Sequence, residues 1–340
     1  MSAALLAVRA ARRHPQRRRA AVVIGLSGAV VGVFAARVLL GDYTITVPDF
    51  FRILFGADIP GATYILMETK LPRALLAVMV GAALGVSGAI FQTTLRNALA
   101  SPDVIGVSLG ASTAAVFAIV TLDLDGVSVS AFAVTGALAV SLLIRLVAGT
   151  TGGYRLVLVG IGVAAALQSV IQYLFTRADL YDAHLALRWL TGSVSAADWP
   201  TLRLLSVLLL VLLAPLVWLG RSLRVVELGA DTAAGLGVTA RRTDALLLMA
   251  VVLTAVAVAA AGPIAFVAFL AGPVARALNQ GRTTLVGAGL VGSVLVVGAD
   301  YIADYLLADI NFPVGVVTGA FGAPFLLWLV GTGRTGGRTA

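Results

Sequence analysis

The chain has 340 residues, of which 60% are hydrophobic and only 12% are charged, and its mean hydropathy is +1.02. A soluble domain carries roughly a quarter charged residues, so the composition excludes an ordinary soluble protein. The sequence has no cysteine, which excludes disulfides, thiol nucleophiles, iron–sulfur clusters and cysteine-type zinc sites.

The first segment is a basic arm at residues 1–19. It carries Arg9, Arg12, Arg13, Arg17, Arg18 and Arg19 directly before the first apolar run. Such a cluster fixes the orientation of a membrane protein and contacts anionic lipid, so we do not read the net charge of +8 as a sign of nucleic-acid binding. The run that follows, from Ala20 to Leu40, exceeds the roughly 7–15 residues of a signal-peptide core and predicts a retained helix.

Further apolar runs recur to Val330, with the charges confined to the short stretches between them. A bilayer core about 30 Å thick needs roughly 20 apolar residues per helix. The runs predict an all-α polytopic membrane protein with ten transmembrane helices. Their expected ranges are 20–41, 73–93, 104–121, 127–147, 156–175, 201–219, 244–261, 264–278, 284–303 and 313–331, so that the permease domain spans residues 20–331 and a tail spans 332–340.

The charges orient this bundle. With the arm in the cytoplasm, most of the 24 lysines and arginines fall on cytoplasmic segments and most of the 16 acidic residues fall outside. This agrees with the positive-inside rule, and an even number of spans returns the C-terminus to the cytoplasm. The four tryptophans, Trp189, Trp199, Trp218 and Trp328, fall near the expected interfaces. We therefore expect a multi-pass protein of the cell inner membrane.

Glycine stripes in two spans predict close helix packing. They are formed by Gly81, Gly85 and Gly88 in the second span and by Gly315, Gly319 and Gly322 in the tenth. Four prolines predict irregular, short helices in the last third of the chain. They are Pro263, Pro273, Pro313 and Pro324.

Two short patterns resemble catalytic motifs, but the expected spans lack the partner residue that each would need. Ser87 and Ser108 each lie in a short pattern typical of serine hydrolases, but both patterns need a histidine base. The two histidines, His14 in the arm and His184 in an outer loop, lie outside the spans. No catalytic residue, metal ligand set or cofactor site is predicted.

The chain also lacks the elements of its own energy source. A phosphate-binding loop ends in Lys-Ser or Lys-Thr, whereas the only lysine, Lys70, is followed by Leu71. ATP hydrolysis would have to come from another chain. Asp300, near the outer end of the ninth span, is the one candidate for proton coupling, and helix capping or an interhelical hydrogen bond explains it equally well.

The longest cytoplasmic loop, residues 220–243, reads as two very short helices. The first would run from Arg221 to Leu228 and end at Gly229 in a left-handed cap. Asp231 would then cap a second turn, which Gly235 and Gly237 would stop. Charged edges and small apolar faces suit docking into a groove on a partner, and an ordinary solvated loop is the alternative.

Six collinear blocks resemble the permeases of the iron–siderophore and cobalamin importer family, the FecCD type of ABC transporter. They are Lys70-Leu71-Pro72-Arg73, GAALGVSGAIFQTTLRNALASPDVIGVSLGAS (81–112), RWLTGS (188–193), ELG to LGV (227–238), GPIAFVAFLAGPVAR (262–276) and FPVGVVTGAFGAP (312–324). They cover nearly the whole chain after the arm.

The resemblance implies a type II ABC importer permease that itself is not an enzyme. It would pair with a second permease, identical or related, above two ATPase subunits, and an extracytoplasmic solute-binding protein would deliver a ferric siderophore. Haem or cobalamin are alternative cargoes. A proton-coupled secondary transporter and a membrane hydrolase are alternatives of other classes.

The resemblance also assigns roles to residues. The ATPase-coupling residues are Arg224, Glu227, Leu228, Gly229, Asp231, Ala234, Leu236 and Gly237. The cytoplasmic gate is formed by Asn97 and Leu99 after span two and by Gly153 and Tyr154 after span four. Lys70 and Arg73 match the outer block whose cations receive acidic residues of the binding protein.

Three departures from the family pattern qualify these roles. Ala98 stands where the family often has proline, so the gate turn is expected to be less rigid. Gly272-Pro273 stands where Pro-His is common. Asp304 stands where some members have an outer arginine, which makes a third basic docking contact doubtful.

Overall fold

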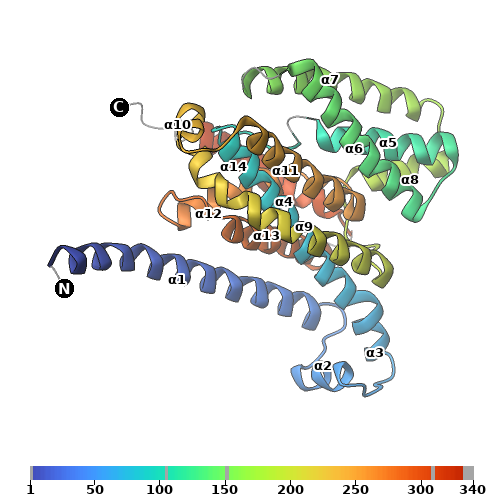
Figure 1. The fold of residues 1–340 in the computed structure, drawn as a ribbon. Coiled ribbons are helices and arrows are strands. Elements are labelled where there is room, and N and C mark those ends of the chain that lie inside the picture. Colours follow the sequence, from blue (N-terminus) through green and yellow to red (C-terminus); the bar gives the residue numbers. More distant parts are fainter. Residues whose placement is uncertain (1–2, 104–105, 150–152, 308–310, 332–340) are drawn as a thin grey trace.

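The computed structural model describes residues 3–103, 106–149, 153–307 and 311–331, and within them the chain is helical and contains no strand (Figure 1). Ten helices correspond to the ten expected ones. They are α1 (Ala3–Leu39), α4 (Leu71–Thr94), α5 (Val107–Leu122), α6 (Gly126–Ala148), α7 (Gly153–Phe175), α9 (Trp199–Val226), α11 (Ala240–Ala261), α12 (Val267–Leu278), α13 (Leu285–Tyr305) and α14 (Val314–Gly331).

Seven of the described helical segments are long and apolar enough to cross a membrane by themselves. The other three, α5, α12 and α14, are apolar but shorter. The all-helical membrane architecture is therefore confirmed, whereas the count of ten crossings stays a prediction.

The arm at residues 1–19 is not a separate segment, because α1 begins at Ala3 and continues without a break into the first apolar run. Arg18 and Arg19, at the junction, are exposed.

Four short elements were not predicted from the apolar runs. They are α2 (Val47–Leu54), α3 (Ala62–Tyr64), the π-helical turn η1 (Ile65–Lys70) and α8 (Leu180–Leu190). Two of them begin with a recognisable cap: Thr46 accepts a hydrogen bond from the backbone N–H of Asp49, and Asp179 accepts one from that of Asp182. Figure 1 shows α2, α3 and α8 at one end of the bundle and the start of α1 with α10 (Ala230–Gly235) at the other.

Helix α4 forms the centre of the bundle, packed against α13, α11, α12, α9 and α1, while α5 packs against α6 and α7 (Figure 1). The predicted glycine stripe explains the closeness of α4 to two of its neighbours. A Cβ on Gly81 or Gly85 would strike the backbone of α13, and one on Gly88 would strike the carbonyl of Ala268 on α12. In the second predicted stripe, Gly315 and Gly322 are similarly crowded, but Gly319 faces open space.

The prolines of the last third act as expected. Pro273 and Pro324 lie inside α12 and α14. The chain before α12 is irregular, and Phe266 begins that helix with a positive φ of 65°. The eighth helix consequently starts at Val267, three residues later than the predicted 264.

Candidate functional site

The segment 220–243 differs in detail from its prediction. Helix α9 continues without a break to Val226, so the expected first short helix is the last part of α9. The second short helix exists as α10, but Gly229, with a φ of 109°, occupies its N-cap position. Asp231 therefore lies in the first turn of α10 and does not cap it. Gly237, with a φ of 84°, follows the end of the helix as predicted.

This segment is anchored on one face and exposed on the other. Val226, Ala233 and Val238 are buried in the same apolar cluster as α11. The outward face holds two large apolar side chains, Leu228 at 59% and Leu236 at 61% exposure. Of the eight predicted coupling residues only Gly229 is buried; the exposed ones are Arg224, Glu227, Leu228, Asp231, Ala234, Leu236 and Gly237. Large apolar side chains exposed on a segment outside the apolar spans are typical of a protein-binding surface.

Two turns at the same end of the bundle lie beside the segment. Thr283, in the turn between α12 and α13, donates its hydroxyl to Glu227 Oε1 at 3.0 Å. Arg96 Nη1, from the turn after α4, lies 3.2 Å from the position that a Cβ on Gly229 would take. The segment thus lies beside the turn after α4, next to the first predicted gate turn, and is hydrogen-bonded to the turn between α12 and α13.

The first predicted gate turn is built around Asn97. Asn97 Oδ1 accepts a hydrogen bond from the backbone N–H of Leu99 at 2.9 Å, and its own N–H donates to the carbonyl of Gln92 at 3.0 Å. Leu99 packs against Phe269 and Leu270 of α12. The turn with Ala98 is therefore held by one side-chain and one backbone hydrogen bond, where a proline would restrict the backbone directly.

The second predicted gate turn is only partly described. Gly153 and Tyr154 begin α7, whereas their side-chain environment, together with Thr151 and Gly152, lies outside the described residues. The helix before this turn is tied to α11, because Arg145 Nη2 lies 2.9 Å from Asp244 Oδ1.

A buried polar link joins α4 to α12 next to the first gate turn. Gln92, 2% exposed, donates from Nε2 to the carbonyl of Phe269 at 2.9 Å, and its Oε1 accepts from Arg276 Nη2 at 2.9 Å. A Cβ on Gly272 would strike Gln92 Oε1. The Gly272 departure thus gives Gln92 its room. Sequence reasoning missed this link, although a glutamine inside an apolar helix is a usable signal.

At the opposite end, two arginines and two aspartates form a buried ion cluster between α1, α4 and α13. Arg37 Nε lies 2.6 Å from Asp300 Oδ2, and Arg73 Nη2 lies 2.6 Å from Asp300 Oδ1. Asp304 Oδ2 lies 2.8 Å from Arg37 Nη2 and 2.9 Å from Arg73 Nη1. Asp300, considered for proton coupling or capping, has two guanidinium partners and is fully buried.

The docking role of Lys70 and Arg73 stays a prediction, and both side chains already have partners within the chain. The two residues are 4% and 8% exposed. Lys70 Nζ donates to the carbonyls of Leu40 and Tyr43 at 2.7 and 2.6 Å, so that it closes the loop after α1. Lys70 uses two of its three N–H donors in this way, and Arg73 is paired with two carboxylates.

The two serines of the hydrolase-like patterns have structural partners. Ser87 Oγ donates to the carbonyl of Ala250 at 2.6 Å and lies 2.7 Å from Thr254 Oγ1, which joins α4 to α11. Ser108 donates to Asp103 in the turn before α5. Burial raises the pKa of the Asp103 carboxyl, and the hydrogen bond from Ser108 partly offsets this.

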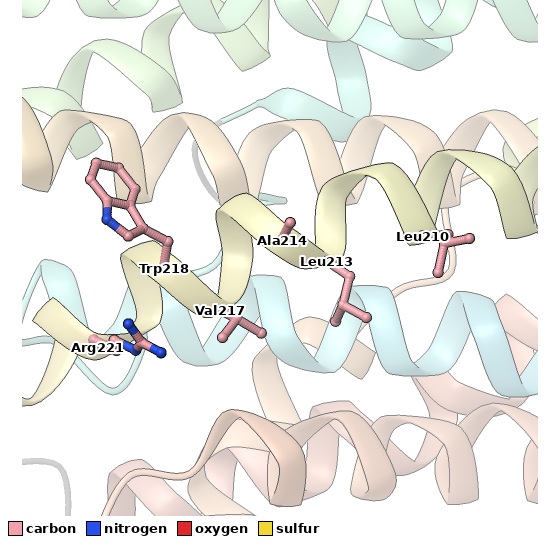
Figure 2. A pocket seen from close by; sticks show the side chains of 6 residues that line it. All are labelled: Leu210, Leu213, Ala214, Val217, Trp218 and Arg221. Atoms are coloured by element: carbon pink, nitrogen blue, oxygen red, sulfur yellow. The ribbon is translucent and has the colours of Figure 1, made fainter.

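Two hollows open on the bundle surface. One, of about 430 Å³, lies along the C-terminal half of α9 and is lined by that helix alone, as Figure 2 shows. Its lining residues are Leu210, Leu213, Ala214, Val217, Trp218 and Arg221. The other, of about 580 Å³, lies between α6, α8, α9 and α11 at the opposite end.

Comparisons with known proteins match nearly the whole chain. The model of the FecCD transport family matches residues 29–332. A ferric enterobactin transport system permease protein of Escherichia coli (strain K12) is 38% identical over 305 residues, covering 88% of this chain and 92% of that protein. A probable siderophore transport system permease protein of Bacillus subtilis (strain 168) is 34% identical, with 91% and 93% covered.

A solved structure shows the same fold. It is described as an inward-facing metal-chelate type ABC transporter, and it superposes with a TM-score of 0.80 at 24% identity. The superposition covers 92% of this chain and 99% of that one.

Proposed function

The chain belongs to the FecCD transport family, and we propose that it carries a ferric siderophore through the inner membrane into the cytoplasm. Members of this family are permease subunits of ABC importers, which are transport components and not enzymes. They lie in the membrane and work with ATPase, solute-binding and second permease partners. The chain is such a subunit.

The cargo is inferred from the relatives. Proteins similar to this chain are named as permeases for ferric enterobactin at 38% identity, for ferric dicitrate at 37% and for ferric hydroxamates at 33%. These ligands share iron held inside an organic chelator. A chelate of this class is the proposed substrate. If the substrate were haem or cobalamin instead, the proposed transport mechanism would be the same.

The observation that carries the coupling proposal is the anchored, leucine-exposing segment 220–243. Leu228 and Leu236 would enter an apolar groove on an ATPase subunit, with one ATPase under each of two permeases. Exposed anchors of this type contribute most of the binding energy in protein interfaces. The buried face, held by Val226, Ala233 and Val238, would transmit movement of the ATPase to the bundle.

The proposed route to the gate has two branches. Movement of Gly229 would reach Arg96 and the Asn97 turn, and movement of Glu227 would reach Thr283 and the α12–α13 turn. The Gln92–Arg276 link lies between these branches. We infer that both turns shift together when the cytoplasmic gate, including Gly153 and Tyr154, opens toward the cytoplasm.

The topology proposed with this function has ten crossings and both termini in the cytoplasm. The three short helices would each cross with the help of neighbouring protein, since non-ideal spans are tolerated where other helices cover them. A second permease, identical or related, would complete the pathway.

Uptake into vesicles tests the proposal. Vesicles holding this chain, its partner permease and the ATPase, supplied with binding protein, should take up radio-iron-labelled siderophore only when ATP is present. Uptake that follows an imposed proton gradient without ATP would contradict it. ATP-driven uptake of haem or cobalamin, with no uptake of any ferric siderophore, would contradict the cargo alone.

A further inference from the structure

The 580 Å³ hollow is a groove with apolar walls and a polar mouth. Its volume lies within the range of roughly 300–1,000 Å³ typical of small-molecule sites. The charged groups that line it, Arg188, Asp125 and Asp198, stand at the end of α8 and directly before α6 and α9, all at the same end of the bundle.

The depth of the groove matches one leaflet of a membrane. Along α9 the lining extends from Asp198 to Leu208, which is about 15 Å at a rise of 1.5 Å per residue. Along α6 it extends from Asp125 to Val134, which is about 14 Å. Half of a hydrocarbon core about 30 Å thick is also about 15 Å.

The walls place the mouth at the membrane surface. Trp189 lines the groove near Arg188, at the level where amphipathic rings gather in membrane proteins. Ser130 and Ala259 both line the groove, and Ser130 Oγ donates to the carbonyl of Ala259 at 2.7 Å, so that α6 and α11 are joined along its wall. The groove is therefore a built feature between packed helices.

The charges at the mouth have unused capacity. Arg188 makes one long hydrogen bond, from Nη2 to Ser195 Oγ at 3.3 Å, and forms no ion pair within the described residues. Asp125 precedes α6 without capping it. Asp198 accepts one hydrogen bond from the backbone N–H of Thr201. With one cation and two carboxylates, the mouth disfavours an anionic chelate or an anionic lipid headgroup. It suits a ligand that carries both a positive and a negative charge.

We propose that the groove binds one phosphatidylethanolamine molecule from the leaflet at this end of the bundle. An acyl chain lies along α9, the phosphate accepts hydrogen bonds from Arg188, and the ammonium group donates to Asp125 and Asp198. A primary ammonium has three N–H donors for these carboxylates, whereas the quaternary ammonium of phosphatidylcholine has none. The site therefore discriminates between two zwitterionic lipids of equal net charge.

Native mass spectrometry of the purified importer tests this, after exchange into an equal mixture of phosphatidylethanolamine, phosphatidylcholine and phosphatidylglycerol. The wild-type permease should retain one phosphatidylethanolamine. Arg188→Gln should lower its occupancy about tenfold or more, as expected for loss of a hydrogen bond between charged groups. Asp125→Lys should move the preference toward phosphatidylglycerol, because the mouth then carries a net positive charge.

Two further variants test whether the lipid is bound in the groove itself. Arg203→Gln changes an exposed arginine of α9 that does not line the groove, and it should leave retention unchanged. Leu204→Trp fills the groove without touching its charges, and it should displace the lipid. The proposal would be overturned if all three lipids were retained equally, or if retention were unchanged in both Arg188→Gln and Leu204→Trp. It would also be overturned if a second permease or a ferric chelate occupied the groove.

Discussion

Arg73 of α4 and Asp300 of α13 form a buried ion pair, with Arg73 Nη2 2.6 Å from Asp300 Oδ1. Asp300 holds Arg37 of α1 at the same distance through its other oxygen. Three helices far apart in the sequence thus share one carboxylate. This geometry explains why a charge is tolerated at a position where an unpaired one would be costly.

Removing that carboxylate should destabilise the permease severely. Asp300→Asn leaves two buried arginines with Asp304 alone, and breaking a buried pair costs about 3–5 kcal/mol. Thermal unfolding of the purified protein should show a large loss of stability. Asp49→Asn is the matched control, because its pair with Arg52 is exposed at the surface and contributes about 0–1 kcal/mol. Similar stability losses in the two variants would contradict the assignment.

Helix packing around α4 gives a second prediction. Gly88→Ala places a methyl group against the carbonyl of Ala268, and overpacking of this kind costs about 1–3 kcal/mol. Gly298→Ala on α13, where a Cβ meets nothing within 4 Å, should be neutral or stabilising. Unfolding temperatures of the two variants measure the difference, and a neutral Gly88→Ala would show that α4 and α12 can separate freely.

The Gln92–Arg276 link should behave as a unit. Gln92→Leu leaves the Arg276 guanidinium and the Phe269 carbonyl without their partner, which costs about 1–3 kcal/mol and slows uptake. The double variant with Arg276→Met should be closer to wild type than the sum of the single changes. Additive effects on unfolding free energy would mean that the two side chains do not interact.

The positions of the helices could be read from the sequence because each long apolar run has only one way to satisfy its backbone in lipid. The close packing of α4 against α12 and α13 could likewise be predicted, from the glycine stripe in the second span. The amphipathic α2 and α8 were missed, since their signals are short caps such as Thr46 and Asp179.

The side-chain clusters could not be predicted, because their members are remote in sequence. Arg37 and Asp300 are separated by 263 positions, and nothing local distinguishes Arg37 from an interfacial anchor. The same limit hides the intramolecular partners of Lys70 and Arg73, whose docking role stays a prediction. Their motif was recognised, but the carboxylates and carbonyls that bury them lie on other segments.

Stability should also depend on Asp103. Burial raises the pKa of this carboxyl above its unfolded value, so its contribution is fully present below the unfolded pKa and is lost as pH rises through the folded one. Relative to Asp103→Asn, the wild-type protein should therefore lose stability as the pH is raised above about 4, the ordinary pKa of an aspartate. Thermal unfolding across this range measures the difference between the two proteins. A difference that does not change with pH, or one that changes in the opposite direction, would contradict the shift.

The most direct measurement for the account as a whole is ATP-driven siderophore uptake by vesicles carrying the Leu228→Ser, Leu236→Ser permease, together with co-purification of the ATPase. Loss of two exposed apolar anchors should weaken ATPase binding and lower uptake about tenfold or more, while Leu54→Ser, an exposed leucine of α2 at the opposite end, leaves both unchanged. Wild-type uptake and ATPase retention in the double variant would contradict the central claim that segment 220–243 couples ATP hydrolysis to transport.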